Sequence, residues 1–308
     1  MEKQEVLEQL KREKDAVILA HYYVEPEVQA VADYIGDSFY LSRKATELPN
    51  RTLVFCGVSF MGESAKLLNP EKTVLLPDAA ADCPMAHMVS KSVVDAARRQ
   101  YDDLAVVCYI NSTEEIKSWS DVCVTSANAV SIVKNLPNRH ILFIPDKNLA
   151  HYVAEQVPEK EFIFNEGYCP VHEHMAAEEI LLLKREHPKA EVLAHPECCG
   201  GVLQLADYIG STSGIISYAG KSPKKEFIIA TECGVAYALG KERPDAAFYF
   251  PKTSPVCGDM KKITLENIIQ VLKTGENEVL VNEKTAAAAG STLTRMLTLA
   301  GQAETGAV

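Results

Sequence analysis

The chain has 308 residues, of which 47% are hydrophobic and 24% are charged, a composition typical of a globular protein large enough for two or three domains. It carries 31 Lys and Arg against 42 Asp and Glu, a net charge of −11, so its surface repels nucleic acid and anionic membranes. The chain shows no signal peptide and no apolar run long enough to span a bilayer. We therefore expect a cytoplasmic protein without nucleic-acid or membrane partners.

The nine cysteines need an explanation other than disulfide bonds. Their number is odd, and a reducing compartment disfavours a disulfide framework in a chain of this size. Structural zinc sites usually contain paired Cys-x-x-Cys motifs, and the sequence has none. Some of the thiols are therefore candidates for chemistry.

After a charged helical pattern over residues 1–15, the chain repeats one pattern three times. Similar helix-and-turn stretches are anchored on Asp33, Asp121 and Asp207, at spacings of 88 and 86 residues. An apolar run ends 12 residues before each anchor, and two more runs follow about 21 and about 41 residues after it. Short apolar runs that alternate with amphipathic helices are typical of buried parallel strands joined by crossover helices.

The repeat predicts an α/β fold of three homologous αβα domains, each with a parallel sheet, arranged with pseudo-threefold symmetry around a central site. The expected boundaries are 1–84, 85–170 and 171–264. A helical tail over 265–308, weakened at Gly290, is expected to pack on the first unit.

Polar residues recur in the same register at the expected carboxyl ends of the strands, where open α/β sheets bind ligands. Each unit supplies a strand-end pair, a hydroxyl five residues after its anchor and a cysteine 48 or 50 residues after it. The pairs are His21 with Tyr23, Tyr109 with Asn111 and His195 with Glu197; the hydroxyls are Ser38, Ser126 and Thr212; the cysteines are Cys83, Cys169 and Cys257. The pattern predicts one site shared by the three units.

Three thiolates without a fourth suit a [4Fe-4S] cluster in which one iron keeps an open coordination site. Such an iron acts as a Lewis acid toward a substrate hydroxyl or carboxylate. The same thiolates could hold a catalytic zinc ion, although zinc does not require three separate domains. A chance coincidence of loop cysteines is the other alternative, and the shared register argues against it.

The other cysteines have simpler interpretations. Cys56, Cys108, Cys123 and Cys233 lie in or beside apolar runs and are interpreted as small buried hydrophobes. Cys198 and Cys199 follow the strand end at Glu197 and could approach the site, but the other repeats have no counterpart.

Several of the polar residues could have a structural role instead of a functional one. His21 and His195 could be core histidines, and the three hydroxyls could be plain helix N-caps, a role compatible with anion binding. The repeated strand-end positions favour function. The three anchor aspartates are interpreted as turn or packing residues. His87, His172 and His174 flank cysteines, and His172, three residues after Cys169, is a candidate to contact the substrate or support the metal.

Together, ten segments resemble those of quinolinate synthases, the iron-sulfur enzymes of bacterial and archaeal NAD biosynthesis. They extend from about residue 20 to residue 270 and comprise AHYYVEPEVQAVADYIGDS, FCGVSFMGESAKLLNPEKTVLLPD, CPMA, YINSTEEIKSWSDVCVTSANA, PDKNLA, CPVH, AHPEC, GSTSGI, TECG and CGDMKKITLENI. The resemblance implies three αβα domains around a pseudo-threefold axis, in agreement with the repeat.

The resemblance also implies an activity. Iminoaspartate and dihydroxyacetone phosphate condense to quinolinate with loss of phosphate and two waters, a transferase-type reaction coupled to dehydration. The implied ligands of one [4Fe-4S] cluster per chain are Cys83 of CPMA, Cys169 of CPVH and Cys257 of CGDM. An enzyme that produces iminoaspartate is an expected functional partner.

The family motifs also imply roles for the site residues. Tyr23, Tyr109, His195 and Glu197 are the expected catalytic residues, with Tyr23 and Glu197 as partners in proton transfer. Substrate contacts are expected from His21, Ser38, Tyr109, Ile110, Asn111, Ser126, His172, His195, Pro196, Glu197, Ser211 and Thr212.

Two other functions remain open at this point. The first is an iron-sulfur hydro-lyase acting on a small hydroxy acid, which would use the same open iron. The second is an iron-sulfur redox sensor, which would need a partner-binding face, and the acidic chain shows no basic recognition segment.

Overall fold

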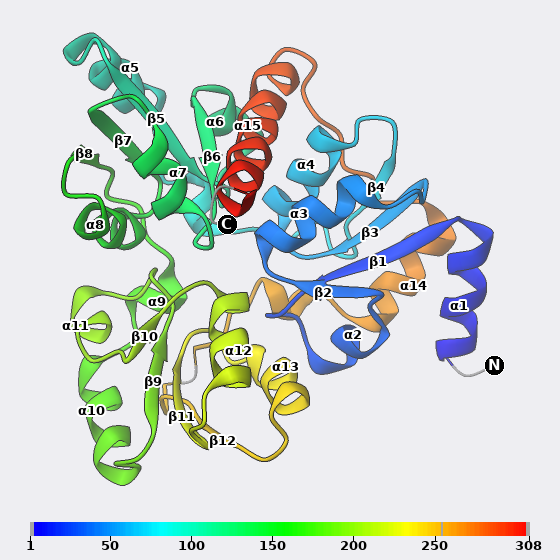
Figure 1. Ribbon diagram of the computed structural model, residues 1–308. Helices are drawn as coiled ribbons and strands as arrows, with labels where there is room; N and C mark the ends of the chain where they lie inside the picture. The colour runs from blue at the N-terminus through cyan, green and yellow to red at the C-terminus, as the bar shows by residue number, and fades with distance from the viewer. Residues whose placement is uncertain (1–2, 254, 306–308) are drawn as a thin grey trace.

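The computed structural model describes residues 3–253 and 255–305, and these form three four-stranded sheets (Figure 1). The strand orders are β2-β1-β3-β4, β6-β5-β7-β8 and β10-β9-β11-β12, the same pattern three times. All strand pairs within the sheets are parallel. The predicted α/β class with three αβα units is confirmed.

The elements follow the predicted alternation of strands and helices. The first unit contains α1 (Lys3–Glu13), β1 (Ala16–His21), α2 (Pro26–Val31), β2 (Tyr34–Gly36), α3 (Ser38–Glu47), β3 (Thr52–Cys56), α4 (Ser59–Leu68) and β4 (Thr73–Leu75). The second contains η1 (Pro84–His87), α5 (Lys91–Gln100), β5 (Leu104–Tyr109), α6 (Glu114–Ser118), β6 (Val122–Val124), α7 (Ala129–Asn135), β7 (His140–Ile144), α8 (Lys147–Gln156) and β8 (Glu161–Phe164).

The third unit and the tail complete the chain. The third unit contains α9 (Pro170–Glu173), α10 (Ala177–Glu186), β9 (Glu191–Ala194), α11 (Gly200–Leu203), β10 (Tyr208–Ile209), α12 (Thr212–Lys221), β11 (Glu226–Ala230), α13 (Val235–Glu242) and β12 (Ala247–Tyr249). The tail contains η2 (Met260–Lys262), α14 (Leu265–Thr274) and α15 (Ala286–Thr305). None of the helices within the described ranges has the length and hydrophobicity that a bilayer span requires.

The core explains why the first apolar run of each unit forms a central strand. Every residue of β1 and β5 is buried, as expected for strands covered by helices on both faces. One continuous hydrophobic cluster joins the first two units with α14 and α15. The third unit instead has two smaller clusters, one on each face of its own sheet. It is therefore a separately packed layer, and it meets the other two at the strand ends.

The anchors Asp33, Asp121 and Asp207 have the same structural role in each unit. Each carboxylate accepts a hydrogen bond, at 2.7–2.8 Å, from a backbone N–H of the central strand. The backbone N–H of each anchor donates to the carbonyl of that same strand residue at 2.8–3.0 Å. The pair of bonds fixes the chain as it enters the short edge strand, which confirms the interpretation of the anchors as structural residues.

The tail differs in part from its predicted position. The helix α14 packs on α1 and β3 of the first unit, as expected. The longer α15 packs mainly on α6, β6 and α7 of the second unit and also contacts α4 of the first unit (Figure 1). Small residues permit this close approach, because a Cβ at Gly290 would lie 3.5 Å from the carbonyl oxygen of Leu67. Polar contacts add to it, since Thr292 Oγ1 lies 3.1 Å from Cys123 Sγ.

Candidate active site

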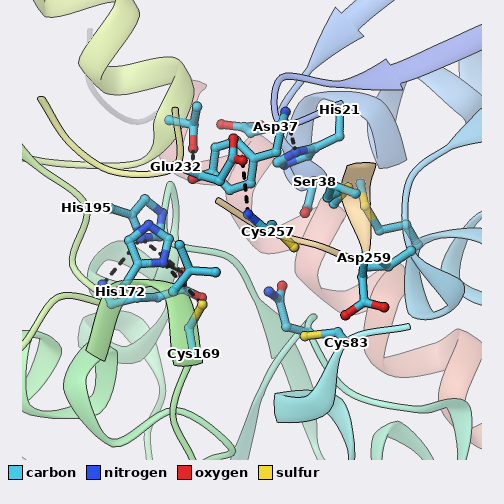
Figure 2. A pocket seen from close by; sticks show the side chains of 18 of the residues that line it. His21, Asp37, Ser38, Cys83, Cys169, His172, His195, Glu232, Cys257 and Asp259 are labelled. Carbon is cyan, nitrogen blue, oxygen red and sulfur yellow. Dashed lines mark hydrogen bonds and ion pairs between the residues drawn. The ribbon is translucent and has the colours of Figure 1, made fainter. Parts of the chain in front are cut away.

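A cavity of about 240 Å³ is lined by residues of all three units (Figure 2). It lies at the carboxyl ends of the strands, where the sequence placed the site. Most of the predicted site residues line it, namely His21, Tyr23, Ser38, Cys83, Tyr109, Asn111, Ser126, Cys169, His172, His195, Glu197, Thr212 and Cys257. The structure therefore brings together residues that lie up to 236 positions apart in the chain.

Three predicted contacts do not line the cavity within the described part of the chain. Ile110 is buried in the hydrophobic core, and Pro196 lies between the lining residues His195 and Glu197. The Ser211 hydroxyl accepts a hydrogen bond from the Gly214 N–H at 3.1 Å and so caps α12. These residues support the backbone beside the cavity.

The three repeated cysteines enter the cavity from three separate parts of the chain (Figure 2). Cys83 and Cys169 are the N-cap residues of η1 and α9, and Cys257 precedes η2. Burial raises the pKa of all three thiols. They interact electrostatically, Cys83 with both of the others. Only a bound cation would hold three neighbouring buried sulfurs as thiolates, so this donor set fits a metal centre.

Two buried oxygens of the same cavity lack a hydrogen-bond partner among the described residues. They are Asn111 Oδ1 and Glu197 Oε1. An unpaired buried acceptor costs about 1–3 kcal/mol, so a bound group that supplies a donor or a metal would stabilise both. The cavity thus offers three sulfur ligands together with free oxygen acceptors.

A second group of possible metal ligands overlaps with the first. The ligand atoms of Cys169, His172 and Glu197 lie within 4.8 Å of one another. His172 Nδ1 is 2.9 Å from Glu197 Oε2 and 3.2 Å from Cys169 Sγ. Since the His172 ring already pairs with the carboxylate, these two residues are better placed to support Cys169 than to replace the three-cysteine set.

The rings of His21 and His195 are held in the same way in two different units. His21 Nδ1 accepts the Tyr23 backbone N–H at 3.2 Å, and His195 Nδ1 accepts the Glu197 backbone N–H at 3.3 Å. A neutral imidazole whose Nδ1 accepts carries its proton on Nε2. His195 Nε2 accordingly lies 3.2 Å from Ser126 Oγ, a cavity residue. His195 Nδ1 also lies 3.3 Å from Glu197 Oε2. Because burial lowers the pKa of both rings, they are neutral at pH 7, and each can donate one hydrogen bond.

A chain of hydrogen bonds crosses the cavity wall from the third unit to the first and back. Tyr23 Oη lies 2.8 Å from both Thr212 Oγ1 and Thr231 Oγ1. Thr231 Oγ1 lies 2.9 Å from His172 Nε2, whose other ring nitrogen contacts Glu197. Burial raises the pKa of Tyr23 well above its usual value, so the phenol is protonated at neutral pH. The hydrogen-bonded chain thus connects the Tyr23 phenol to the carboxylate of Glu197.

Glu197 is the ionised group at the centre of this network. Burial alone would raise its pKa, but the His195 and His172 rings and the Tyr109 hydroxyl lower it to about 2. The side chain is 3% exposed, so the charge is not shared with solvent. A buried carboxylate with one free oxygen can accept a proton or hold a donor group of a ligand.

Helix N-termini supply partial positive charge at the opposite wall. Ser38 and Thr212 are the first residues of α3 and α12, near the strand-to-helix turns where they were expected, but the N-caps are Asp37 and Ser211, so the alternative that these hydroxyls are plain N-caps is wrong. Ser126 differs, because it lies in the turn that precedes α7. Asp37 caps α3 through the Tyr40 N–H at 3.0 Å and also accepts the Ser213 N–H of α12 at 3.4 Å. One carboxylate thereby joins the helix ends of two units.

Three residues at the cavity were not predicted from the sequence, namely Asp37, Thr231 and Glu232. Thr231 and Glu232 directly follow β11, the second apolar run of the third unit. The predicted strand-end pairs and cysteines follow the first and third apolar runs of each unit. Polar residues directly after the second run are the same kind of signal. Asp37 directly precedes the predicted Ser38 and could have been found as its helix cap.

The remaining cysteines lie outside the lining of the cavity. Cys56, Cys108, Cys123 and Cys198 are fully buried, which confirms the interpretation of the first three as small hydrophobes. Cys233 is partly exposed, contrary to that interpretation, since it follows β11 in a loop. Cys198 Sγ lies 3.8 Å from Met175 Sδ and does not line the cavity.

His21 and His195, two of the buried histidines, predict a pH-dependent stability. Burial lowers the pKa of His21 to about 4 and of His195 to about 3, although Asp37 and Glu197 oppose the shift. The unfolded chain takes up these protons below pH 6.5 while the folded protein does not, so the free energy of unfolding falls as the pH falls. For His21 alone the loss is on the order of 2 kcal/mol at pH about 5.

Urea unfolding of the metal-free protein between pH about 7 and about 5 measures this effect. His21→Gln, which keeps a neutral donor, should reduce the slope. An unchanged slope in that variant would show that His21 is not the group that titrates.

Comparison with known proteins identifies the relatives of this chain. A family model described as "Quinolinate synthetase A protein" matches residues 5–298. A quinolinate synthase from Fusobacterium nucleatum is 52% identical over 295 residues, which cover 96% of this chain and 98% of the relative. One from Clostridioides difficile is 51% identical over 294 residues, covering 96% and 97%. Because both matches extend over nearly the full chain, including the residues of the cavity, the protein belongs to the quinolinate synthase family, enzymes of NAD biosynthesis.

Proposed function

We propose that the protein condenses iminoaspartate with dihydroxyacetone phosphate to quinolinate, phosphate and two waters. Family membership supports the product, and one observation supports the chemistry: three cysteines, one from each unit, share a cavity with unpaired oxygen acceptors. Cys83, Cys169 and Cys257 would hold one [4Fe-4S] cluster. When bound, the cluster would supply a Lewis-acidic iron with an open coordination site.

Both substrates are anions, although the chain carries a net charge of −11 and no lysine or arginine is among the described residues that line the cavity. The Nε2–H donors of His21 and His195 and the N-termini of α3 and α12 supply the local positive potential. Ser38, Ser126 and Thr212 add hydroxyl donors. We assign carboxylate binding to His21 and these hydroxyls, and phosphate or oxygen binding to Tyr109, Asn111 and Thr212.

The proton transfers are assigned to the network around Glu197. Its carboxylate accepts a proton, because it is ionised and has one free oxygen. Tyr23 donates one, because its phenol is protonated and is connected to Glu197 through Thr231 and His172. Tyr109 interacts with the same carboxylate and assists in positioning it. The dehydration steps require both a proton donor and an acceptor, and the cavity provides them within one network.

The proposed reaction is expected to take place in the cytoplasm. Within the described residues all the cysteines are free thiols, which is consistent with the reducing cytoplasm. Iminoaspartate must come from an enzyme that oxidises or otherwise converts an amino-acid precursor, so we propose functional coupling to an iminoaspartate-producing enzyme.

Anaerobic purification followed by iron and sulfide analysis and a quinolinate assay tests the function. We expect four irons and four sulfides per chain, on the stoichiometry of a [4Fe-4S] cluster, and quinolinate only when both precursors are present. Citrate- and malate-like hydroxy acids serve as control substrates. Iron-loaded protein that dehydrates a hydroxy acid but forms no quinolinate would overturn the proposal.

A further inference from the structure

The backbone N–H groups of all three repeated cysteines donate to carboxylates. The Cys83 N–H donates to Asp82 Oδ1 at 2.8 Å, and the Cys169 N–H donates to Asp146 Oδ2 at 3.2 Å. The Cys257 N–H donates to Glu232 Oε1 at 3.1 Å, a contact drawn in Figure 2. The same bond is therefore made in all three units.

Two of the three carboxylates are equivalent by the internal repeat, and the third is not. Asp146 and Glu232 each lie 25 residues after the anchor of their unit, two residues beyond the ends of β7 and β11. The equivalent position in the first unit is Val58, which has no acceptor. There the neighbouring Asp82 makes the bond instead. In all three units a carboxylate accepts the cysteine N–H, although in the first unit this carboxylate comes from a different position of the repeat. The hydrogen bond is therefore the feature that the units share.

Asp146 and Glu232 are buried carboxyl groups whose oxygens accept hydrogen bonds from the backbone, and burial raises the pKa of both. Both side chains are 0% exposed. Asp146 Oδ1 accepts the Leu149 N–H at 2.7 Å, and Glu232 Oε2 accepts the Gly234 N–H at 2.6 Å. Asp82 is partly exposed and also contacts Ser59 and His87. Burying a carboxyl group is costly unless each oxygen is bonded, and in Asp146 and Glu232 one oxygen accepts a cysteine N–H while the other accepts a second backbone N–H.

In the third unit, the side chain of Lys261 also interacts with Glu232. Lys261 Nζ lies 3.1 Å from Glu232 Oε1 and donates to the Tyr23 carbonyl at 2.7 Å. The Cys257 turn is thereby connected through Glu232 and Lys261 to the loop that carries Tyr23. Displacing Glu232 would disturb both a metal-ligand turn and the position of the phenol.

We propose that Asp82, Asp146 and Glu232 are positioning residues that fix the backbone of the three cysteines so that their sulfurs converge on one metal centre. The inference rests on the proposed function, because it assigns these cysteines as ligands. It extends that function to three residues that act through the backbone of the cysteines, one of which, Glu232, also lines the cavity. Groups that orient metal ligands affect metal retention strongly, with losses of about 10–100-fold when they are removed.

The test compares Asp146→Asn and Glu232→Gln with a matched control, Asp37→Asn. Each substitution keeps the side-chain size and replaces one of two accepting oxygens with an NH₂ group. Asp37 is also a buried helix cap that bonds two backbone N–H groups, but neither belongs to a cysteine. The control therefore reproduces the loss of a buried capping carboxylate at this cavity without touching a ligand turn.

The primary readout is the rate at which anaerobically loaded protein releases iron to a chelator. We expect release about tenfold faster in Asp146→Asn and Glu232→Gln than in the unsubstituted protein and in Asp37→Asn. Asp82→Asn should show a smaller effect, because solvent can reach its partly exposed site. Urea unfolding of the metal-free proteins measures the general loss of stability separately.

The outcomes distinguish this inference from the function on which it rests. Unsubstituted protein without iron and sulfide would contradict the proposed function itself. Unsubstituted protein that holds the cluster, with unchanged release in both Asp146→Asn and Glu232→Gln, would overturn the positioning role alone. Faster release that Asp37→Asn reproduces, or that only accompanies an equal loss of stability in the metal-free protein, would also overturn it.

Discussion

Replacing Cys83, Cys169 or Cys257 with alanine is expected to abolish the brown colour and quinolinate formation together. Each thiol is the only repeated cysteine of its unit, and the three enter one cavity from three directions (Figure 2). Loss of one sulfur leaves two thiolates, which cannot complete the three-cysteine ligand set of a cluster with one open iron. The measurement is iron and sulfide per chain, with the activity assayed under anaerobic conditions.

Cys199→Ala is the control for this experiment. Cys199 is partly buried beside α11, is not among the cavity residues and contacts the Met175 carbonyl at 3.8 Å. Its removal should leave iron content and turnover unchanged. A colourless variant of Cys83, Cys169 or Cys257 that still forms quinolinate would refute the role of the cluster in catalysis. Retention of a full complement of iron in all three variants would refute their assignment as ligands.

Much of the fold was predictable because each repeat shows itself in short stretches of sequence, namely apolar runs and an aspartate at fixed spacing. The apolar runs that end at His21 and Tyr109 became β1 and β5 with those same last residues, since fully buried parallel strands read as continuous apolar runs. The anchors were predictable as structural residues because a side chain that bonds a neighbouring strand recurs at a fixed offset. The tail helix α15 was harder, because its face of small residues carries no sign of which unit it will contact.

Some residues of the candidate site were likewise predictable from the sequence, and others were not. The cysteines, His21, His195 and Glu197 were found because they recur in register, and the structure gathers them in one cavity. Thr231 directly follows the second apolar run of its unit, a position that the prediction from the first and third runs did not include. Its role arises only when β11 brings it within 2.8 Å of Tyr23 Oη, a residue 208 positions away in the chain. Such contacts between units are set by tertiary packing, and a repeat within one sequence does not encode them.

Glu197→Gln is expected to lower turnover by about 10²–10⁴-fold while iron and sulfide content stay unchanged. The substitution keeps the size of the side chain but removes the ionised carboxylate that the His172 ring contacts at 2.9 Å. It also removes the acceptor at the end of the hydrogen-bonded chain from Tyr23. The amide cannot take up a proton at neutral pH, so the steps that need a base lose their acceptor.

The matched control is Glu173→Gln, which removes a carboxylate from the neighbouring helix α9. Glu173 pairs with Lys147 at 2.7 Å and with Asn148 outside the cavity lining, so turnover should be unaffected. Normal turnover in Glu197→Gln would exclude proton transfer by this residue. Loss of iron in parallel with activity would assign Glu197 to support of Cys169 through His172, since His172 Nδ1 lies 3.2 Å from the sulfur. Intact iron with slow turnover would leave proton transfer as the role that accounts for a buried, ionised carboxylate with one free oxygen.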